Sequence, residues 1–145
     1  MDHIFNVNVR GVILCSQAVV PHLKRAGGGV IVHISSINAI RPQRGAMVYA
    51  ASKAAVSSLA QSMGKELAAD RIRVVAVAPG DIATGRSAQI TQELKERGMT
   101  SDVAGQTPLG EGAPEDIGAV VTFLCSKGAR FVTGTTWVVD GGLLS

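Results

Sequence analysis

The 145-residue sequence predicts an α/β fold built around a parallel sheet. Three short apolar runs, rich in β-branched residues, alternate with longer segments of helical periodicity, which is the pattern of βα units. The runs are apolar almost throughout, as expected for strands that helices cover on both faces. The sequence contains no internal repeat and no linker-like segment, so residues 1–145 are expected to belong to one domain.

The first part of the chain predicts a helix, a strand and a second helix. Over residues 2 to 25 the apolar side chains recur at spacings of three and four, and the glycines at 27–29 follow where this helix should end. Residues 30–34, Val-Ile-Val-His-Ile, predict a buried strand. The segment 48–69 is dense in Ala, Ser, Leu and Met and predicts a helix whose small side chains allow close packing.

The rest of the chain predicts two further strands separated by a long connection. Residues 72–77 form an apolar run that stops at a Pro-Gly pair, and residues 135–139 form the last run. Between them, residues 81–113 are rich in Gly, Thr, Ser and Gln, with a short helix expected at 88–97. Connections of this length are commonly lids over a pocket. Residues 114–126 predict a helix that opens with proline and two acidic side chains.

Three strands amount to about half of a doubly wound sheet, which usually has about six. We therefore expect a partial doubly wound parallel sheet that lacks its N-terminal part. The strand at 30–34 would then be an open apolar edge, and such an edge can pair with other chains. On this basis the isolated chain is expected to be marginally soluble, oligomeric or partly molten.

The composition excludes several other classes of protein. The net charge is +3, but the Lys and Arg residues are scattered and the chain has only five aromatic residues, so no nucleic-acid interface is expected. Cys15 and Cys125 lie far apart without a CxxC spacing or a histidine cluster, which predicts no metal site and two reduced, buried thiols. His33 is expected to be a hydrogen-bonded core histidine. No membrane-spanning run and no leader peptide is expected, which favours a cytoplasmic protein.

Tyr49 and Lys53 are the first residues that indicate chemistry. Their spacing of four places both side chains on one face of a helix, about one turn apart. An ammonium close to a phenol favours the phenolate, so this pair can serve as a tuned acid and base. A lysine that packs its stem on an aromatic ring is the plain alternative. Ser36 favours the first interpretation, because it follows the predicted strand 30–34 at the edge where ligands bind in open α/β sheets.

Five blocks extend this pattern over essentially the whole chain. They are Phe-Asn-Val-Asn-Val-Arg-Gly at 5–11, Ile-Ser-Ser at 34–36, Tyr-x-x-x-Lys at 49–53, Pro-Gly-x-Ile-x-Thr at 79–84, and Thr-Gly-x-x-x-x-Val-Asp-Gly-Gly at 133–142. Together, and in this order, they resemble the short-chain dehydrogenase/reductase family.

The resemblance implies an enzyme with a catalytic tetrad. Tyr49 would exchange a proton with the substrate oxygen, as general acid in reduction and general base in oxidation. Lys53 would hold the nicotinamide ribose and favour the phenolate of Tyr49. Ser36 would hydrogen-bond the substrate oxygen, and Asn8 would support a water in the proton relay. Without the resemblance, Asn8 would be interpreted as a polar residue tolerated in a helix.

The resemblance also implies the cofactor, the substrate class and the assembly. The cofactor would be NAD or NADP and the substrate a small carbonyl or alcohol, with no metal involved. Besides Tyr49 and Lys53, the backbone of Pro79 and Gly80 and the side chain of Ile82 would line the nicotinamide. The hydroxyl of Thr84 would reach the diphosphate. Pro79 and Gly80 also have a plain interpretation as a strand-ending turn. The intact enzyme would be a homodimer or homotetramer.

The chain departs from the family in its cofactor-binding part. The family's phosphate-binding glycine loop, its Asn-Asn-Ala-Gly block and the residue that distinguishes NAD from NADP are not found in residues 1–145. In the family's Rossmann-like sheet of seven strands, this chain would supply the last three. We therefore expect the C-terminal catalytic part of such an enzyme, not competent alone. The alternative is a non-catalytic interaction protein that pairs its open edge strand or its long helices with an intact relative.

Overall fold

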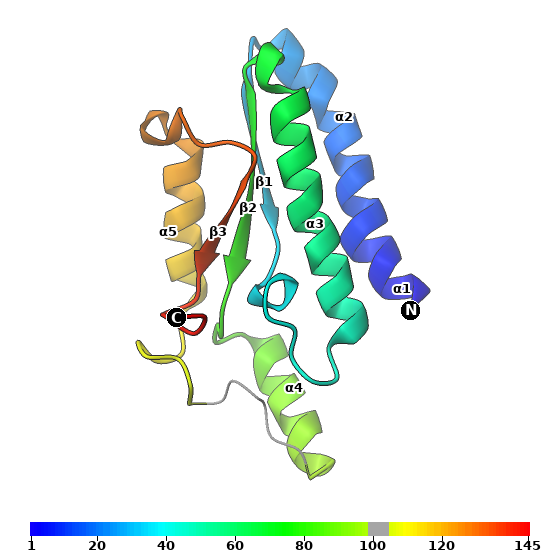
Figure 1. Ribbon diagram of the computed structural model, residues 1–145, viewed down its shortest axis with the longest axis vertical. Coiled ribbons are helices and arrows are strands. Elements are labelled where there is room, and N and C mark those ends of the chain that lie inside the picture. Colours follow the sequence, from blue (N-terminus) through cyan, green and yellow to red (C-terminus); the bar gives the residue numbers. More distant parts are fainter. Residues whose placement is uncertain (99–104) are drawn as a thin grey trace.

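The computed structural model describes residues 1–98 and 105–145, and it confirms the predicted partial, doubly wound parallel sheet (Figure 1). The sheet has the order β1-β2-β3. Its strands are β1 (Gly29–Ile34), β2 (Ile72–Pro79) and β3 (Thr135–Val139). Both neighbouring pairs are parallel, with Ile34 opposite Val77 and Pro79 opposite Val139. Two long helices cover one face of the sheet and a shorter helix covers the other.

The N-terminal segment is helical from Asp2 to Arg25, as predicted, but it contains a π-helix that the sequence did not predict. It consists of α1 (Asp2–Phe5), the π-helix η1 (Asn6–Arg10) and α2 (Gly11–Arg25). Two crossed hydrogen bonds close its end, from the Gly27 amide to the Lys24 carbonyl and from the Gly28 amide to the Leu23 carbonyl. Gly27 takes the left-handed conformation that this termination requires, with φ +81°.

Helix α3 (Met47–Glu66) lies beside α2 and packs directly on the sheet (Figure 1). Its buried positions are small or β-branched: Ala50, Ser52, Val56, Ala60 and Gly64. The predicted helix at 48–69 is therefore confirmed, except that its last turn is the separate 3₁₀ helix η3 (Ala68–Asp70). Arg71, with φ +59°, then turns the chain into β2.

Gly64 shows how closely α3 approaches the start of β3. A Cβ atom at this position would lie 2.5 Å from the Gly134 backbone nitrogen, closer than real Cβ contacts allow. We therefore expect Gly64→Ala to lower the free energy of unfolding by about 1 to 2 kcal/mol, even though alanine is the better helix former. The measurement is denaturant unfolding followed by circular dichroism.

Gly118 provides the matched control for that substitution. It lies in helix α5 (Pro114–Cys125), and a Cβ atom there would meet nothing within 4 Å. Gly118→Ala should therefore raise the free energy of unfolding by about 0.5 to 1 kcal/mol. Equal effects of the two substitutions would contradict the close approach of α3 to β3.

The connection between β2 and α5 contains helix α4 (Gly85–Glu96). The short helix predicted at 88–97 therefore exists but begins three residues earlier. The cause is a capping box, in which the Thr84 hydroxyl accepts from the Ser87 amide while the Ser87 hydroxyl accepts from the Thr84 amide. Part of the predicted lid at 81–113 lies outside the described residues.

The core lies on both faces of β2, the central strand. On the side of α3, the buried cluster is Ala60, Ile72, Val74 and Ala76. On the side of α5, the buried cluster is Val75, Val77, Leu124 and Ala129. Arg73 joins β2 to α5 and to the segment before β3, because its guanidinium donates to the Leu124 and Val132 carbonyls. The predicted continuous burial of the strand at 72–77 is confirmed apart from Arg73.

Two predictions about buried side chains are wrong. Both cysteines are exposed: Cys125 is the last residue of α5, and Cys15 lines a hollow of about 560 Å³ between α2 and β1. His33 lines the same hollow and is buried, but its Nε2 atom has no hydrogen-bond partner. For Cys15 and His33 the physical reason is shared, because no described element covers the outer side of β1 next to these two residues.

The helical segment from Asp2 to Arg25 has the predicted bounds, but it is more apolar than the expectation of no membrane-spanning run implies. By length and composition alone it passes the test for a membrane-crossing helix. The core helix of a soluble protein passes the same test, so this finding is weak support for a membrane. In this structure the helix lies against β1, with Leu23 packed on the core cluster of α3 and β2.

His33 should make the stability of the chain sensitive to acid. Burial lowers its pKa below the ordinary value of 6.5. As the pH falls below 6.5, the unfolded chain binds a proton that the folded chain does not. The free energy of unfolding should therefore fall, by up to about 1.4 kcal/mol per pH unit, until the lowered pKa is reached, and this contribution is absent above pH 6.5.

The measurement is the free energy of unfolding at several pH values in the parent and in His33→Gln. The parent should lose more stability between neutral and mildly acidic pH than His33→Gln does. The exposed His3 gives the control, since His3→Gln should keep the acid sensitivity of the parent. Identical pH profiles for the parent and His33→Gln would contradict the prediction.

Candidate active site

The candidate site lies at the edge of the sheet where its parallel strands end. The strands β1, β2 and β3 all point toward this edge, and α3 begins there (Figure 1). Ser35 and Ser36 directly follow β1, and the loop after them returns through the 3₁₀ helix η2 (Ile37–Ala39) to the start of α3. This return brings the loop after Ser36 into contact with α3.

Tyr49 and Lys53 form a pair on the first turns of α3. The Lys53 ammonium lies 5.7 Å from the centroid of the Tyr49 ring. It also donates a hydrogen bond of 2.9 Å to the Ile34 carbonyl, the last residue of β1. Burial lowers the pKa of Lys53. A cation is therefore held beside the phenol and against the end of β1, while Tyr49 remains 37% exposed and open to a ligand.

Ser36 lies in the loop between β1 and α3, where it is buried and is fixed by the residues that follow it. Its hydroxyl oxygen accepts a hydrogen bond of 3.2 Å from the Asn38 amide and so caps η2. The Asn38 side chain in turn accepts from the Gln43 amide, which closes the loop. Since a serine hydroxyl also carries one donor, the Ser36 O–H can still be directed at an oxygen of a bound molecule.

Asn8 lies in the π-helix η1 and reaches α3 through Ser52. Its side-chain nitrogen donates to the Ser52 hydroxyl over 3.0 Å, and that hydroxyl donates to the Tyr49 carbonyl over 2.7 Å. Single π-helical turns inside α-helices are frequent at functional sites. Asn8 is therefore a partner of the Tyr49 turn rather than a solvent-facing amide.

The other predicted cofactor residues lie at the end of β2, on the same edge of the sheet. Pro79 is the last residue of β2, and the Gly80 amide donates to the Val139 carbonyl of the neighbouring strand. A Cβ atom on Gly80 would lie 2.6 Å from the Asp140 Cα atom, so the close packing of these two turns requires glycine. This contact supports the plain interpretation of the Pro-Gly pair, and it leaves the cofactor role untested.

Ile82 and Thr84 follow on the same segment and have structural partners of their own. Ile82 forms an isolated parallel bridge with Gly112, and Thr84 caps α4. The structure therefore brings Asn8, Tyr49 and Lys53 together through direct contacts or one bridging side chain, and it holds Ser36 in the loop beside them. In the connection between β2 and α5, Ile82 pairs with Gly112 and Thr84 caps α4.

The donor set at this edge fits the ribose end of a nicotinamide dinucleotide. A ribose offers hydroxyl groups, and the Lys53 ammonium and the Tyr49 hydroxyl are suitable donors for them. The ring contact between the two side chains shows that they face the same region. The glycine motif that would cradle the diphosphate end does not occur within residues 1–145.

Sequence reasoning missed three serines that hold the Tyr49 turn. Ser52 connects it to Asn8, while Ser35 and Ser57 connect it to the end of β1. Ser52 and Ser57 lie in a helix rich in small residues, where a hydroxyl gives no distinct sequence signal. Ser35 stands beside Ser36 after the same strand, so sequence position alone did not separate its role from that of Ser36.

Comparisons with known proteins agree with this fold. A family model described as enoyl-(acyl carrier protein) reductase matches residues 1–144. The chain is 39% identical over 144 residues to 3-oxoacyl-(acyl-carrier-protein) reductase FabG of Thermotoga maritima, covering 99% of this chain and 56% of that protein.

Solved structures extend the comparison to proteins with bound nicotinamide cofactors. The 3-ketoacyl-(acyl-carrier-protein) reductase of Brucella melitensis complexed with NADH is 33% identical, with a TM-score of 0.85 over 98% of this chain and 57% of that chain. The L-sorbose reductase of Gluconobacter frateurii complexed with NADPH and L-sorbose is 27% identical, with a TM-score of 0.88 and the same coverage. The chain thus spans about half the length of the relatives it matches.

Proposed function

The chain belongs to the short-chain dehydrogenase/reductase family, and on that premise we propose that it carries the catalytic side chains of an NAD(P)-dependent oxidoreductase. The reaction is hydride transfer between the nicotinamide and a small carbonyl or alcohol. The observation that carries the proposal is the Lys53 ammonium, held 5.7 Å from the Tyr49 ring at the carboxyl edge of a parallel sheet.

In the direction of reduction, Tyr49 donates its phenolic proton to the oxygen of the substrate carbonyl. In oxidation, the phenolate accepts the proton of the substrate hydroxyl. The bound cofactor supplies or receives the hydride. Lys53 stabilises the phenolate through its positive charge, and its attraction is strengthened because its surroundings exclude much of the water. Its hydrogen bond to the Ile34 carbonyl fixes the ammonium in that position.

Ser36 and Asn8 assist this proton transfer in the proposed mechanism. The Ser36 hydroxyl hydrogen-bonds the substrate oxygen and orients it toward Tyr49. Asn8 acts from the other side, where it supports the Tyr49 turn through Ser52 and is positioned to hold a water of the proton relay. Pro79, Gly80 and Ile82 would line the nicotinamide, and Thr84 would contact the diphosphate.

Residues 1–145 form, in this proposal, the C-terminal catalytic part of a Rossmann-like domain and are not competent alone. The phosphate-binding glycine motif does not occur among them, so cofactor capture needs residues beyond this sequence. The intact enzyme would be a homodimer or homotetramer. A cytoplasmic location is supported by the two exposed free cysteines, which persist best in a reducing compartment.

A hybrid protein tests the proposed function. In it, residues 1–144 replace the matching 56% of the Thermotoga reductase, whose remaining part supplies the N-terminal half. The hybrid should reduce members of a broad carbonyl panel with NADH or NADPH, followed as loss of reduced-nicotinamide absorbance. A hybrid that folds and binds cofactor, yet turns over no carbonyl or alcohol of the panel, would contradict the proposal.

One observation favours a second candidate function, a non-catalytic interaction protein. The outer edge of β1 has no strand partner among the described residues, and the hollow of about 560 Å³ beside it is lined mostly by apolar residues, with Ser16 and His33 as the polar ones. An intact relative could pair with this edge. The 145-residue chain would then form a stable complex with such a relative in light scattering, and this complex would survive Tyr49→Phe.

A further inference from the structure

We propose that Ser35 is a positioning residue, assisted by Ser57, that fixes the Tyr49–Lys53 turn of α3 against the end of β1. The inference rests on the proposed function, and it assigns the two hydroxyl groups a role that neither the motif nor the comparisons give them. Neither serine is a catalytic residue in this proposal, since both act through Lys53.

The contacts of Ser35 join three elements. Its amide donates to the Val77 carbonyl of β2 over 2.6 Å, which anchors it to the central strand. Its hydroxyl donates to the Lys53 carbonyl of α3 over 2.9 Å and lies 2.8 Å from the Ser57 hydroxyl. Because Ser35 is only 2% exposed, water cannot readily replace these bonds.

The direction of the hydroxyl bonds follows from the donors available. A serine hydroxyl has one hydrogen to donate and two lone pairs. If Ser35 gives its hydrogen to the Lys53 carbonyl, then the bond between the two hydroxyls must be donated by Ser57. Ser57 lies one turn after Lys53 on the same face of α3. The Ser35 hydroxyl therefore contacts this face of the helix at two successive turns, at the Lys53 carbonyl and at the Ser57 hydroxyl.

Lys53 is therefore held at both of its ends by consecutive residues of one strand terminus. Its ammonium donates to the Ile34 carbonyl, and its own carbonyl accepts from the Ser35 hydroxyl. Ser36, the next residue, is proposed to orient the substrate, and Tyr49 lies one turn before Lys53. Any shift of Ser35 thus changes the spacing between the substrate oxygen, the phenol and the ammonium.

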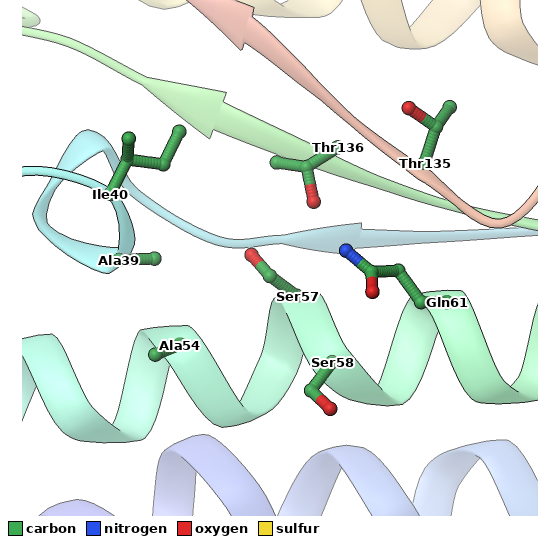
Figure 2. Close-up of a pocket in the computed structure, with 8 residues that line it drawn as sticks. All are labelled: Ala39, Ile40, Ala54, Ser57, Ser58, Gln61, Thr135 and Thr136. Carbon is green, nitrogen blue, oxygen red and sulfur yellow. The ribbon is translucent and has the colours of Figure 1, made fainter.

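The hydrogen bond between the Ser57 and Ser35 hydroxyls is not backed by close side-chain packing beside Ser57. Beside it lies a hollow of about 470 Å³ between α3 and β3, lined by Ser57, Ser58, Gln61 and Thr136 among others. Figure 2 shows the Ser57 hydroxyl pointing toward β1, whereas Ser58 points to the other side of α3. After loss of the Ser57 hydroxyl, the bonds of Lys53 to Ser35 and to the Ile34 carbonyl would therefore have to hold α3 against the end of β1.

The test compares variants in the hybrid enzyme. Ser35→Ala should lower kcat by about tenfold and leave the KM for the carbonyl within about twofold, because it misplaces reacting groups without removing a substrate contact. Ser57→Ala should lower kcat about threefold, and Ser57→Thr, which keeps the hydroxyl, should restore it. The double alanine variant should lose little more than Ser35→Ala, since both hydroxyls serve one link. Ser58→Ala is the matched control and should equal the parent.

A second readout does not depend on activity. Tyr49 is the only tyrosine of the 145-residue chain, so its ring signals in a nuclear magnetic resonance spectrum of the tyrosine-labelled chain are unambiguous. These signals should shift in Ser35→Ala and Ser57→Ala and match the parent in Ser57→Thr and Ser58→Ala.

The outcomes separate the two proposals. Parent-like kcat and parent-like ring signals in folded Ser35→Ala and Ser57→Ala would overturn the positioning role. A hybrid without Tyr49-dependent turnover would instead contradict the proposed function, and the ring signals would still decide whether the serines position Tyr49. Should Ser35→Ala fail to fold, the Ser57→Ala and Ser57→Thr pair decides the matter alone.

Discussion

Tyr49→Phe should reduce the turnover of the hybrid enzyme by at least about 100-fold, the usual lower range for loss of a general acid or base. The substitution removes one oxygen atom and keeps the ring. The contact between the ring and the Lys53 ammonium, 5.7 Å from its centroid, should therefore persist. The Tyr49 carbonyl, which accepts from Ser52, belongs to the backbone and is unchanged.

The measurement is kcat and KM for a carbonyl of the panel, together with a titration of cofactor binding. Binding of NADH or NADPH should change by no more than a few-fold, because the Lys53 contact and the fold are retained. A matched control is Phe123→Leu on α5, whose ring contacts Trp137 on the opposite face of the sheet. Turnover within tenfold of the parent in Tyr49→Phe would contradict the role of the phenol.

Lys53→Met should also reduce kcat by about 100-fold or more, and in addition it should weaken cofactor binding. Methionine keeps much of the length of the side chain but loses the positive charge and the donor to the Ile34 carbonyl. Lys53→Arg should not restore full activity, because a planar guanidinium cannot replace a compact ammonium at a site of this geometry. Lys65→Met, near the exposed end of α3, should behave as the parent.

The role of the Lys53 charge also predicts how kcat depends on pH. Since burial lowers the pKa of Lys53, its ammonium is lost at a lower pH than the ordinary value of 10.5. As the pH rises through the lowered pKa, the charge that favours the phenolate disappears and kcat should fall. This alkaline decline should be present in the parent and absent from the residual activity of Lys53→Met. The same alkaline decline in both proteins would contradict the assignment.

Most of the fold could be predicted from the sequence because local signals and burial agree. The β-branched run at 30–34 and the buried run at 72–77 became strands, and the glycines after Arg25 ended the first helix with crossed hydrogen bonds. The start of α4 was misplaced by three residues because the capping box of Thr84 was not recognised.

The other differences between the predicted and the observed structure arise from contacts between segments that are distant in the sequence. The π-helix η1 has no clear periodic signature, and the contact that it makes with α3 joins Asn8 to Ser52, 44 positions away. The exposure of Cys15 and the unpartnered Nε2 of His33 depend on what covers the outer side of β1, which residue types alone do not reveal.

The sequence predicted the chemical groups of the candidate site, but it did not predict the groups that hold them in place. Spacing placed Tyr49 and Lys53 on one face, and the structure adds the Ile34 carbonyl that holds the ammonium. Nothing in the residue types distinguished Ser35, whose hydroxyl binds the Lys53 carbonyl, from Ser36, whose hydroxyl caps η2. The structure explains Thr84 by its capping of α4 and Gly80 by its close packing against Asp140.

A side-by-side cofactor titration of the 145-residue chain and the hybrid tests most directly whether residues 1–145 hold the catalytic groups without a complete cofactor site. NADH and NADPH are added to each protein while the fluorescence of the reduced nicotinamide is followed, with Lys53→Met as the control in both. We expect saturable binding to the hybrid, weakened by Lys53→Met, and no saturable binding to the chain alone. Saturable binding to the chain alone that Lys53→Met weakens would show that the glycine motif is not required for cofactor capture, and it would contradict the division of roles proposed for this chain.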